Sequence, residues 1–475
     1  MHAFEQFINY YNDTVGPTVL LALLIPVGIL FTVLLKAIQF RKFGLAVQVV
    51  SGKFQKPGEP GDISHFQALS AALSATVGIG NIAGVATAIA WGGPGAAFWI
   101  WMTGFLGMAL KYAECTLALH YRETDAEGMV AGGPMYYIKK GLGPRIGRAA
   151  TVLAVMFAIG TVICSFGTGN MPQSNSMALA LHGTYAIPTW ASGLVIAVLV
   201  FLVIVGGIRR IGAVASKLVP LMAAFYVLGG LTVLLVNHDR VGPAFATIFR
   251  DAFTGEAALK GGFIAAVIWG IKRGLYSNEA GQGSAPIAHA AARTPYAVRE
   301  GLVSMLEPFI DTVLICTLTA LVIVVGGLHV PDATGLAPTF DGAVLTTRSF
   351  ESGLDPIGLG WLGQQVVAIS TVLFALSTAI SWSYYGDRAV TFLFGHPRAV
   401  LVYRIIFSIV IFVGAVQSMK LVWGFADMAI TFMALPNLLA LCMLAPKVLS
   451  LTRQYFEEHA RLVASTRPDA PSPEL

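Results

Sequence analysis

Eleven long apolar stretches constrain the fold of this chain more than any other feature of its sequence. Each is long enough to cross a bilayer as a helix, which takes about 20 mainly apolar residues. Only 12% of the residues are charged, against about 25% in an average soluble domain. These features predict an all-α polytopic membrane protein with one transmembrane domain over residues 1–450. The stretches cover approximately residues 17–39, 65–91, 96–121, 148–180, 189–208, 212–236, 262–291, 299–326, 360–394, 399–418 and 421–446.

Basic residues in the connecting segments predict how the chain is oriented. If the N-terminus lies outside, every segment on the inner side carries several lysines or arginines, as cytoplasmic loops usually do. We therefore expect a cytoplasmic C-terminus and, because residues 451–475 are polar and proline-rich near their end, a disordered cytoplasmic tail there. The net charge of +5 is explained by these loops and indicates no nucleic-acid partner. The outer segments would carry only Arg240, Arg250, Lys260, Arg348 and Lys420.

The second apolar stretch contains a segment that is poorly suited to an unbroken helix, Ser74-Ala75-Thr76-Val77-Gly78-Ile79-Gly80-Asn81. Each glycine costs roughly 1 kcal/mol relative to alanine inside a helix. We interpret the segment as a break whose freed N–H and C=O groups bind a substrate or an ion, since hydrocarbon offers them no partner. The alternative is a close helix–helix contact, which small residues also permit.

The seventh apolar stretch carries a second unusual segment, residues 270–284, with two basic residues, one acid and four glycines. Each charge at the bilayer centre costs about 2.5–3.5 kcal/mol, so the segment must face protein or water. The two interrupted stretches open consecutive sets of five spans with opposite orientations. We expect a 5+5 inverted repeat, residues 62–238 and 260–450, preceded by one extra N-terminal helix. Matched interruptions of this kind are typical of secondary transporters.

Hydroxyl side chains gather in the ninth stretch, where Ser377, Thr378 and Ser381 lie on neighbouring helical positions. They can bond to carbonyls of their own helix or, with carbonyls freed at a break, coordinate a sodium ion through oxygen. Five acids also lie within apolar stretches. We expect structural ion pairs with Lys272 and Arg273 for these acids, and a proton relay is the less favoured alternative. The acids are Glu114, Glu307, Asp311, Asp387 and Asp427.

Four motifs carry a family resemblance. They are Phe66-Gln67-Ala68-Leu69-Ser70-Ala71-Ala72-Leu73 followed by residues 76–85, then residues 132–138, residues 276–286, and Ser381-Trp382-Ser383-Tyr384-Tyr385-Gly386. In this order they resemble the alanine or glycine:cation symporter family, which is similar in fold to the bacterial leucine and neurotransmitter:sodium symporters. The resemblance implies Na+-coupled import of small neutral amino acids by alternating access in a bacterial or archaeal plasma (inner) membrane. Alanine, as either stereoisomer, and glycine are the expected substrates, and proton coupling or a glutamine preference is the alternative.

A zwitterionic substrate needs donors for its carboxylate and acceptors for its ammonium group. Freed N–H groups at the first break would bind the carboxylate, and carbonyls at the second would bind the ammonium. The sodium ion would lie on Thr76, Val77, Ser377, Thr378 and Ser381. The predicted substrate-binding residues are Thr76, Gly78, Ile79, Gly80, Asn81, Phe166, Asn170, Gln173, Tyr276, Ser277, Asn278 and Trp382.

Two other functional classes fit the sequence less well. A channel would show rings of like residues and a wide polar face along several spans, whereas this chain shows isolated interruptions at mid-depth. An enzyme would need a nucleophile with a base or a cluster of metal ligands, and the histidines stand singly near span ends or in loops. We therefore expect a membrane carrier that contacts lipid and is not an enzyme. The sequence gives no oligomeric state.

Overall fold

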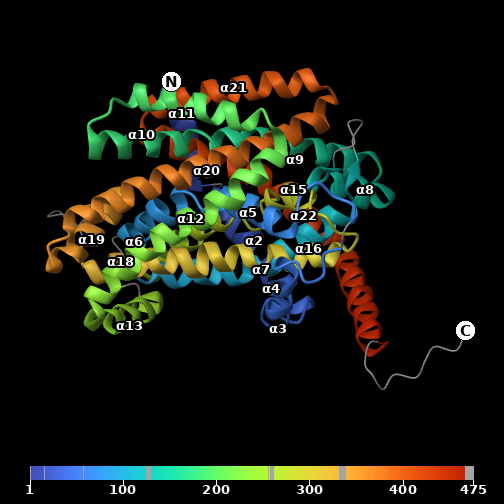
Figure 1. The fold of residues 1–475 in the computed structure, drawn as a ribbon, viewed down its shortest axis with the longest axis horizontal. Helices are drawn as coiled ribbons and strands as arrows, with labels where there is room; N and C mark the ends of the chain where they lie inside the picture. The colour runs from blue at the N-terminus through green and yellow to red at the C-terminus, as the bar shows by residue number, and fades with distance from the viewer. Residues whose placement is uncertain are drawn as a thin grey trace, which may run out of the picture.

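A bundle of long helices forms the body of the protein in the computed structural model (Figure 1). The structure describes residues 2–14, 16–56, 58–124, 130–254, 256, 262–330 and 338–465. The first helices in chain order are α1 (His2–Thr14), α2 (Gly16–Leu34), α3 (Ile38–Arg41), α4 (Phe43–Val50), α5 (His65–Thr76), the π-helical turn η1 (Gly80–Gly84), α6 (Val85–Gly92), α7 (Ala96–His120), α8 (Pro134–Ile146), α9 (Arg148–Gly167), α10 (Met171–Tyr185), α11 (Thr189–Ile204) and α12 (Gly207–Val236).

The remaining chain repeats this pattern of long and interrupted helices. A short antiparallel ribbon, β1 (Glu123–Thr124) and β2 (Val130–Ala131), is the one pair of named strands in the described residues. The helices of the second part are α13 (His238–Thr254), α14 (Gly262–Asn278), α15 (Ala285–His289), α16 (Ala297–Ser304), α17 (Leu306–Pro308), the π-helical segment η2 (Phe309–Cys316), α18 (Thr317–Gly326), α19 (Gly342–Leu354), the 3₁₀ turn η3 (Asp355–Ile357), α20 (Gly360–Phe394), α21 (Pro397–Val416) and α22 (Met419–Ser465).

Each of the eleven predicted spans has a helical counterpart. Six described helices or helix runs are long and apolar enough to cross a membrane, and the bent pair at the first break makes a seventh. The predicted spans at 17–39 and 189–208 correspond to shorter apolar helices. The all-α membrane fold is therefore confirmed, and the count of eleven is consistent with it.

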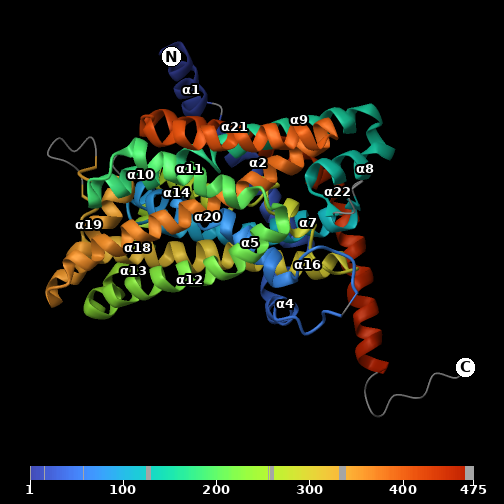
Figure 2. The ribbon, with the colours of Figure 1, turned by 45° about the horizontal axis from the view of Figure 1, so that its top comes forward.

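The two ends of the long axis of the molecule carry different connecting segments. Figures 1 and 2 place α13 and α19 at one end, and α8 and the last turns of α22 at the other. The sequence predicts the segments around α13 and α19 to be outer loops, and those around α8 and the C-terminus to be inner ones. Their separation in space is what the predicted alternation of spans requires.

Large apolar side chains face outward on the helices at the edge of the bundle. Examples are Leu194 and Leu202 on α11, Leu228 and Leu235 on α12, and Ile409 on α21, all more than half exposed. A surface of this composition is unfavourable in water and suits hydrocarbon. The inner faces of the same helices are buried.

The tail prediction is wrong in part. Helix α22 continues to Ser465, and Arg453 pairs with Glu457 at 2.7 Å one turn later, so residues 451–465 are helical. Such i,i+4 pairs support an exposed helix. The rest of the predicted tail, residues 466–475, lies outside the described residues.

Candidate functional site

The first predicted break is present between α5 and α6. The two helices meet at an angle of 52°. Helix α5 begins with a capping box, in which the Ser64 hydroxyl accepts from the Gln67 N–H and the Gln67 side chain accepts from the Ser64 N–H. It ends at Thr76, because the small and flexible residues that follow hold a helix weakly. The stretch was therefore correctly interpreted as a break.

Side chains satisfy the main-chain donors that the first break exposes. The Gly78 N–H donates to Oδ1 of Asn81 at 2.9 Å, and the Ile79 N–H donates to Oε1 of Gln173 at 3.4 Å. Buried amide groups without partners are costly, so such replacements are expected. The predicted donors thus face polar side chains from the break itself and from α10.

Glycine is required at two positions because other helices approach the break closely. A Cβ atom on Gly78 would lie 2.6 Å from Oγ1 of Thr378, and one on Gly80 would lie 3.1 Å from the ring of Tyr276. The break is therefore in van der Waals contact with α20 on one side and α14 on the other. These are the two helices that the sequence predicts to complete the site.

The second predicted break is present between α14 and α15. Helix α14 ends at Asn278, and the backbone turns through three positive φ angles, at Glu279 (54°), Gly281 (80°) and Gly283 (85°). Glycine adopts such angles at little cost. The Leu275 carbonyl accepts from the Glu279 N–H at 3.1 Å and also from Nε2 of Gln282 at 2.9 Å. The two breaks lie side by side, since Gly80 contacts residues 276 and 277.

A buried carboxylate between the two breaks was not predicted as a site residue. Asp311, in η2, accepts from Nδ2 of Asn81 at 2.7 Å, from the Ser277 hydroxyl at 2.8 Å and from the Thr312 hydroxyl at 2.7 Å. Within the described part of the chain, no basic side chain pairs with it. The expected pairing of Asp311 with Lys272 or Arg273 is therefore wrong. An acid within an apolar stretch was the available signal, because such residues usually mark ion pathways.

The hydroxyls of α20 lie against the first break, as predicted. The Ser377 hydroxyl donates to the Ser74 carbonyl at 3.1 Å, and the Thr378 hydroxyl donates to the Val77 carbonyl at 3.4 Å. The buried hydroxyl of Ser381 has no hydrogen-bond partner among the described residues. This group of oxygens carries no formal charge, which suits weak coordination of a monovalent cation.

A third break, between α9 and α10, positions several further residues. Gln173 follows this break and reaches Ile79, whereas Nδ2 of Asn170 donates to the Phe407 carbonyl at 2.7 Å. The Phe166 ring packs on Phe407 with 5.9 Å between the ring centroids. The described contacts thus connect Gln173 with the first break and connect Phe166 and Asn170 with α21.

Trp382 lies between the third and second breaks. Its ring packs over Gly169, and its Nε1–H donates to Oε1 of Glu279 at 2.8 Å. The other carboxylate oxygen of Glu279 accepts from the Ser284 hydroxyl at 2.5 Å. Trp382 is fully buried and joins α20 to the turn that follows α14.

Two predicted residues use their side chains elsewhere. The Thr76 hydroxyl donates back to the Ala72 carbonyl of its own helix at 3.3 Å. Asn278 donates to the Thr103 hydroxyl of α7 at 3.2 Å and accepts from the Ala280 N–H at 3.0 Å. The described hydrogen bonds therefore give Thr76 and Asn278 structural roles at the two helix ends.

Aromatic and charged side chains cover one end of the site. Tyr276 packs on Trp423 with 5.0 Å between the ring centroids, and the Arg273 guanidinium lies 4.9 Å from the Trp423 centroid. Asp427 pairs with Lys272 at 2.8 Å and with Arg273 at 3.4 Å. The expected pairing is therefore confirmed for Asp427.

The same pairing is wrong for the other acids, which find different partners. Glu307 pairs with Lys111 at 2.9 Å, Asp387 pairs with Arg404 at 2.5 Å, and Glu114 accepts from Asn437 at 2.6 Å. Glu307 and Glu114 find partners that are distant in sequence, whereas Arg404 lies on the helix that follows Asp387. Span composition alone does not determine such contacts.

The arrangement encloses a polar site in the middle of an apolar bundle. Asn81, Gln173, Ser277, Thr378 and Trp382 are each at most 2% exposed. The structure therefore holds these groups in a conformation that is closed to both ends. Main-chain amides, amide side chains and hydroxyls can bind a small charged or zwitterionic molecule there.

Comparison with known proteins decides the family. The profile of the Sodium:alanine symporter family matches residues 1–467. The chain belongs to this family. It is 44% identical over 455 residues to the Sodium/alanine symporter AgcS of Methanococcus maripaludis, covering 96% of this chain and 98% of that protein. It is 34% identical to the Probable sodium/glutamine symporter GlnT of Bacillus subtilis, covering 95% and 90% of the two chains.

Solved structures give the same fold at low sequence identity. The transporter MhsT, solved in complex with L-phenylalanine, aligns with a TM-score of 0.57 at 13% identity and covers 83% of this chain and 99% of its own. A manganese transporter of Eremococcus coleocola aligns with a TM-score of 0.53 at 14% identity, over 80% of this chain and 79% of its own. The members of the Sodium:alanine symporter family named above are transporters, so the prediction that the chain is not an enzyme is confirmed.

Proposed function

We propose that this chain is a sodium-coupled symporter that imports small neutral amino acids, alanine and glycine above all. The observation that carries the proposal is the first break, where the Gly78 and Ile79 N–H groups meet only side-chain oxygens of Asn81 and Gln173. A substrate carboxylate can replace these oxygens at the positive end of the helix that follows. Rotation of the two side chains would admit it.

The ammonium group of the substrate would bind at the second break. The Leu275 carbonyl, which now accepts from the Gln282 side chain, would accept from the ammonium group. Tyr276 would close the outer side of the site. The close approach of α14 and α20 to Gly80 and Gly78 leaves space for a small side chain only. This tightness favours alanine and glycine over larger amino acids, because a larger substrate would overlap the walls.

Sodium would bind as a co-substrate at two groups of oxygens. One is the predicted group, formed by the Val77 carbonyl with Ser377, Thr378 and Ser381. The other is Asp311 with Ser277, where a buried carboxylate lacks a basic partner and a cation would supply the missing charge. Binding on either group would order the first break. Ion and substrate would then raise each other's affinity by the same factor.

The coupling ion and the substrate preference have named alternatives among the relatives. The Putative sodium/proton-dependent alanine carrier protein YrbD and the Probable sodium/glutamine symporter GlnT of Bacillus subtilis are each 34% identical to this chain. The higher identity to the sodium/alanine symporter favours sodium and alanine. The protein is a multi-pass plasma membrane protein, and we propose an outer N-terminus, a cytoplasmic C-terminus and lipid contact along α11, α12 and α21.

Counterflow in proteoliposomes tests the proposal. Labelled alanine is taken up against an internal load of unlabelled alanine, in competition with a panel of amino acids, with sodium present or replaced by potassium. The proposal expects saturable, sodium-dependent uptake that alanine and glycine inhibit most strongly. Uptake that is equal in potassium, or that glutamine inhibits better than alanine, would contradict it.

A further inference from the structure

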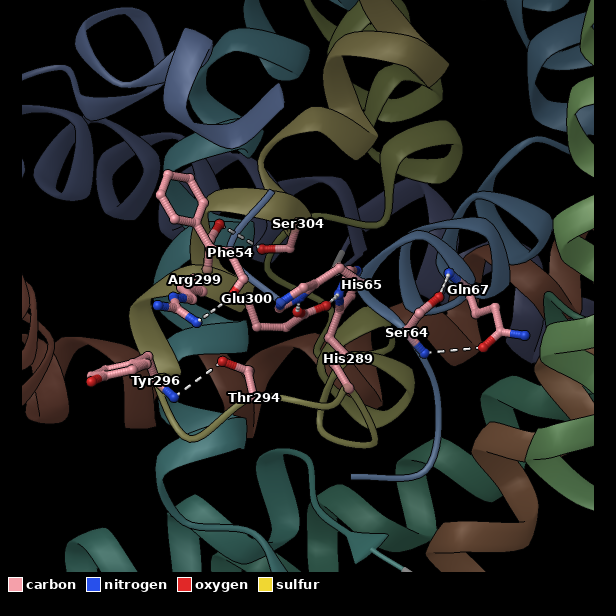
Figure 3. A network of polar contacts seen from close by, with 12 residues as sticks. Phe54, Ser64, His65, Gln67, His289, Thr294, Tyr296, Arg299, Glu300 and Ser304 are labelled. Carbon is pink, nitrogen blue, oxygen red and sulfur yellow. Dashed lines mark hydrogen bonds and ion pairs between the residues drawn. The ribbon is translucent and has the colours of Figure 1, made fainter. Parts of the chain in front are cut away.

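A buried polar network joins the first residue of α5 to the last residue of α15 (Figure 3). Glu300 of α16 contacts two histidines, with its Oε2 2.5 Å from Nδ1 of His65 and its Oε1 2.6 Å from Nδ1 of His289. His65 is the first residue of α5, and His289 is the last residue of α15. All three side chains are at most 1% exposed. One carboxylate thus holds both helices.

His289 also faces a second carboxylate. Its Nε2 lies 3.8 Å from Oε2 of Glu307, whose Oε1 pairs with Nζ of Lys111 at 2.9 Å. Neither Nε2 of His289 nor Oε2 of Glu307 has a hydrogen-bond partner in the described residues. The imidazole of His289 therefore lies between two acids, with one nitrogen directed to each.

The charges of this network balance only if it holds one more proton. Glu300 and Glu307 carry two negative charges, and Lys111 supplies one positive charge. An uncompensated charge in a buried site is unfavourable. A proton on His289 gives an imidazolium with a donor on each nitrogen, and the sum becomes zero.

His65 is the less suitable place for this proton. Its Nδ1–H can donate to Glu300 in the neutral form, and its Nε2 has no partner among the described residues. Protonation there would create a buried donor without an acceptor, which is costly. His289 offers an acceptor, Glu307, to its second nitrogen.

Among the described residues, no other charged side chain forms an ion pair with Glu300 or Glu307. The Arg122 guanidinium donates to the Ala290 and Ala292 carbonyls, and Arg299 pairs with Glu59. Tyr112 and Cys115 of α7 are neutral when buried. Glu114 and Glu279 lie near Lys111 but accept from neutral donors, Asn437 for the first and Trp382 and Ser284 for the second.

We propose that His289 binds a proton between Glu300 and Glu307, and that this proton holds the end of α15 on α16 and α17. The proton comes from water and returns to it, so that the N–H bond at Nε2 of His289 is the bond that forms and breaks. Without it, the Nε2 lone pair of His289 faces a carboxylate, and the network keeps one unbalanced negative charge. His289 then no longer bonds to Glu307, and the end of α15 separates from α17. In the proposed orientation this would open the cytoplasmic side of the site.

Nitrogen NMR of histidine in the full-length protein tests the proton directly. In proteoliposomes containing ¹⁵N-labelled histidine, we expect one imidazole at pH 7 with both nitrogens protonated. Its signal should disappear in His289→Gln and persist in His238→Gln, which removes an exposed histidine near α13. A signal that persists in His289→Gln would overturn the proposal.

Hydrogen–deuterium exchange tests the effect on the helices without using transport. After correction for intrinsic rates, deuterium uptake in α15 should rise with pH, whereas uptake in α21 should not. His289→Gln should lose this pH dependence, and Glu307→Gln, which keeps the histidine, should move the midpoint down by at least about one pH unit. An unchanged midpoint in Glu307→Gln would overturn the proposal even if His289→Gln fails to fold. The result of these measurements does not depend on which amino acid the protein transports, so they test this proposal separately from the proposed function.

Discussion

Asn81 donates from its Nδ2 to Oδ1 of Asp311 at 2.7 Å, and its own Oδ1 accepts from the Gly78 N–H at 2.9 Å. One amide side chain therefore connects the main chain of the first break with a buried carboxylate of η2. A cation that binds to the Asp311 oxygens would compete with the Asn81 amide for them and so change the position of Asn81. The donors available to a substrate carboxylate would change with it, which gives ion and substrate a common structural element.

Asp311→Asn should weaken the response to sodium. The change removes the negative charge that a cation would neutralise while keeping the size of the side chain. We expect the sodium concentration for half-maximal alanine uptake to rise about tenfold or more, which corresponds to about 1.4 kcal/mol. The matched control is Glu351→Gln, an acid in the exposed pair with Arg348. Sodium dependence equal to that of wild type would remove Asp311 from the ion site.

Gly80→Ala should nearly abolish uptake while expression stays intact. The added methyl group would press on the Tyr276 ring and on Cα of Ser277, at 3.1 and 3.3 Å. Overpacking of this kind costs about 1–3 kcal/mol. We expect it to push the two breaks apart. The control is Gly183→Ala, where an added Cβ meets no atom within 4 Å. Initial uptake rates normalised to surface expression measure the effect, and similar rates in the two variants would contradict it.

Thr378→Ala should raise the sodium requirement without removing transport. The substitution deletes the hydroxyl that donates to the Val77 carbonyl at 3.4 Å, and with it one uncharged oxygen ligand. A severalfold increase in the half-maximal sodium concentration is expected. Thr391→Ala serves as the control, because that hydroxyl bonds only to the Asp387 carbonyl of its own helix in the described structure. If both variants respond to sodium alike, the ion does not use Thr378.

Trp382→Phe should destabilise the protein. The change leaves the buried Oε1 of Glu279 without the donor that now lies 2.8 Å away. Leaving a buried acceptor unsatisfied costs about 1–3 kcal/mol, and more for a charged group. Thermal unfolding in detergent measures the loss. Trp190→Phe, at a residue of α11 that is 59% exposed, should leave the midpoint nearly unchanged, and an equal loss in both variants would argue against the contact.

Both breaks could be predicted from the sequence because their cause is local. Glycines and short polar side chains hold a helix poorly wherever the rest of the chain lies, and charges such as Lys272 cannot face lipid. The spacing of the hydroxyl residues in the ninth span likewise predicted that they lie on neighbouring helical positions. The fold class followed from the length and number of apolar stretches.

The partners of the buried acids could not be predicted, since they depend on which spans pack together. Asp311 and Asp427 look alike in sequence, yet one accepts from neutral donors and the other pairs with two cations. The same limit applies to Phe166, which packs on α21. The helical residues 451–465 were missed because a polar segment with i,i+4 pairs resembles a disordered tail in composition.

Helix α22 places Asp427 and Thr452 on one continuous backbone. Asp427 belongs to the ion pair above Tyr276, and Thr452 bonds to the Tyr112 hydroxyl at 2.8 Å. The two residues are 25 positions apart, which corresponds to about 37 Å along a helix at a rise of about 1.5 Å per residue. If Lys272 releases Asp427 and α22 tilts, the end of the helix at Thr452 would move as well, and a fluorophore attached beyond Thr452 would report the binding of an amino acid.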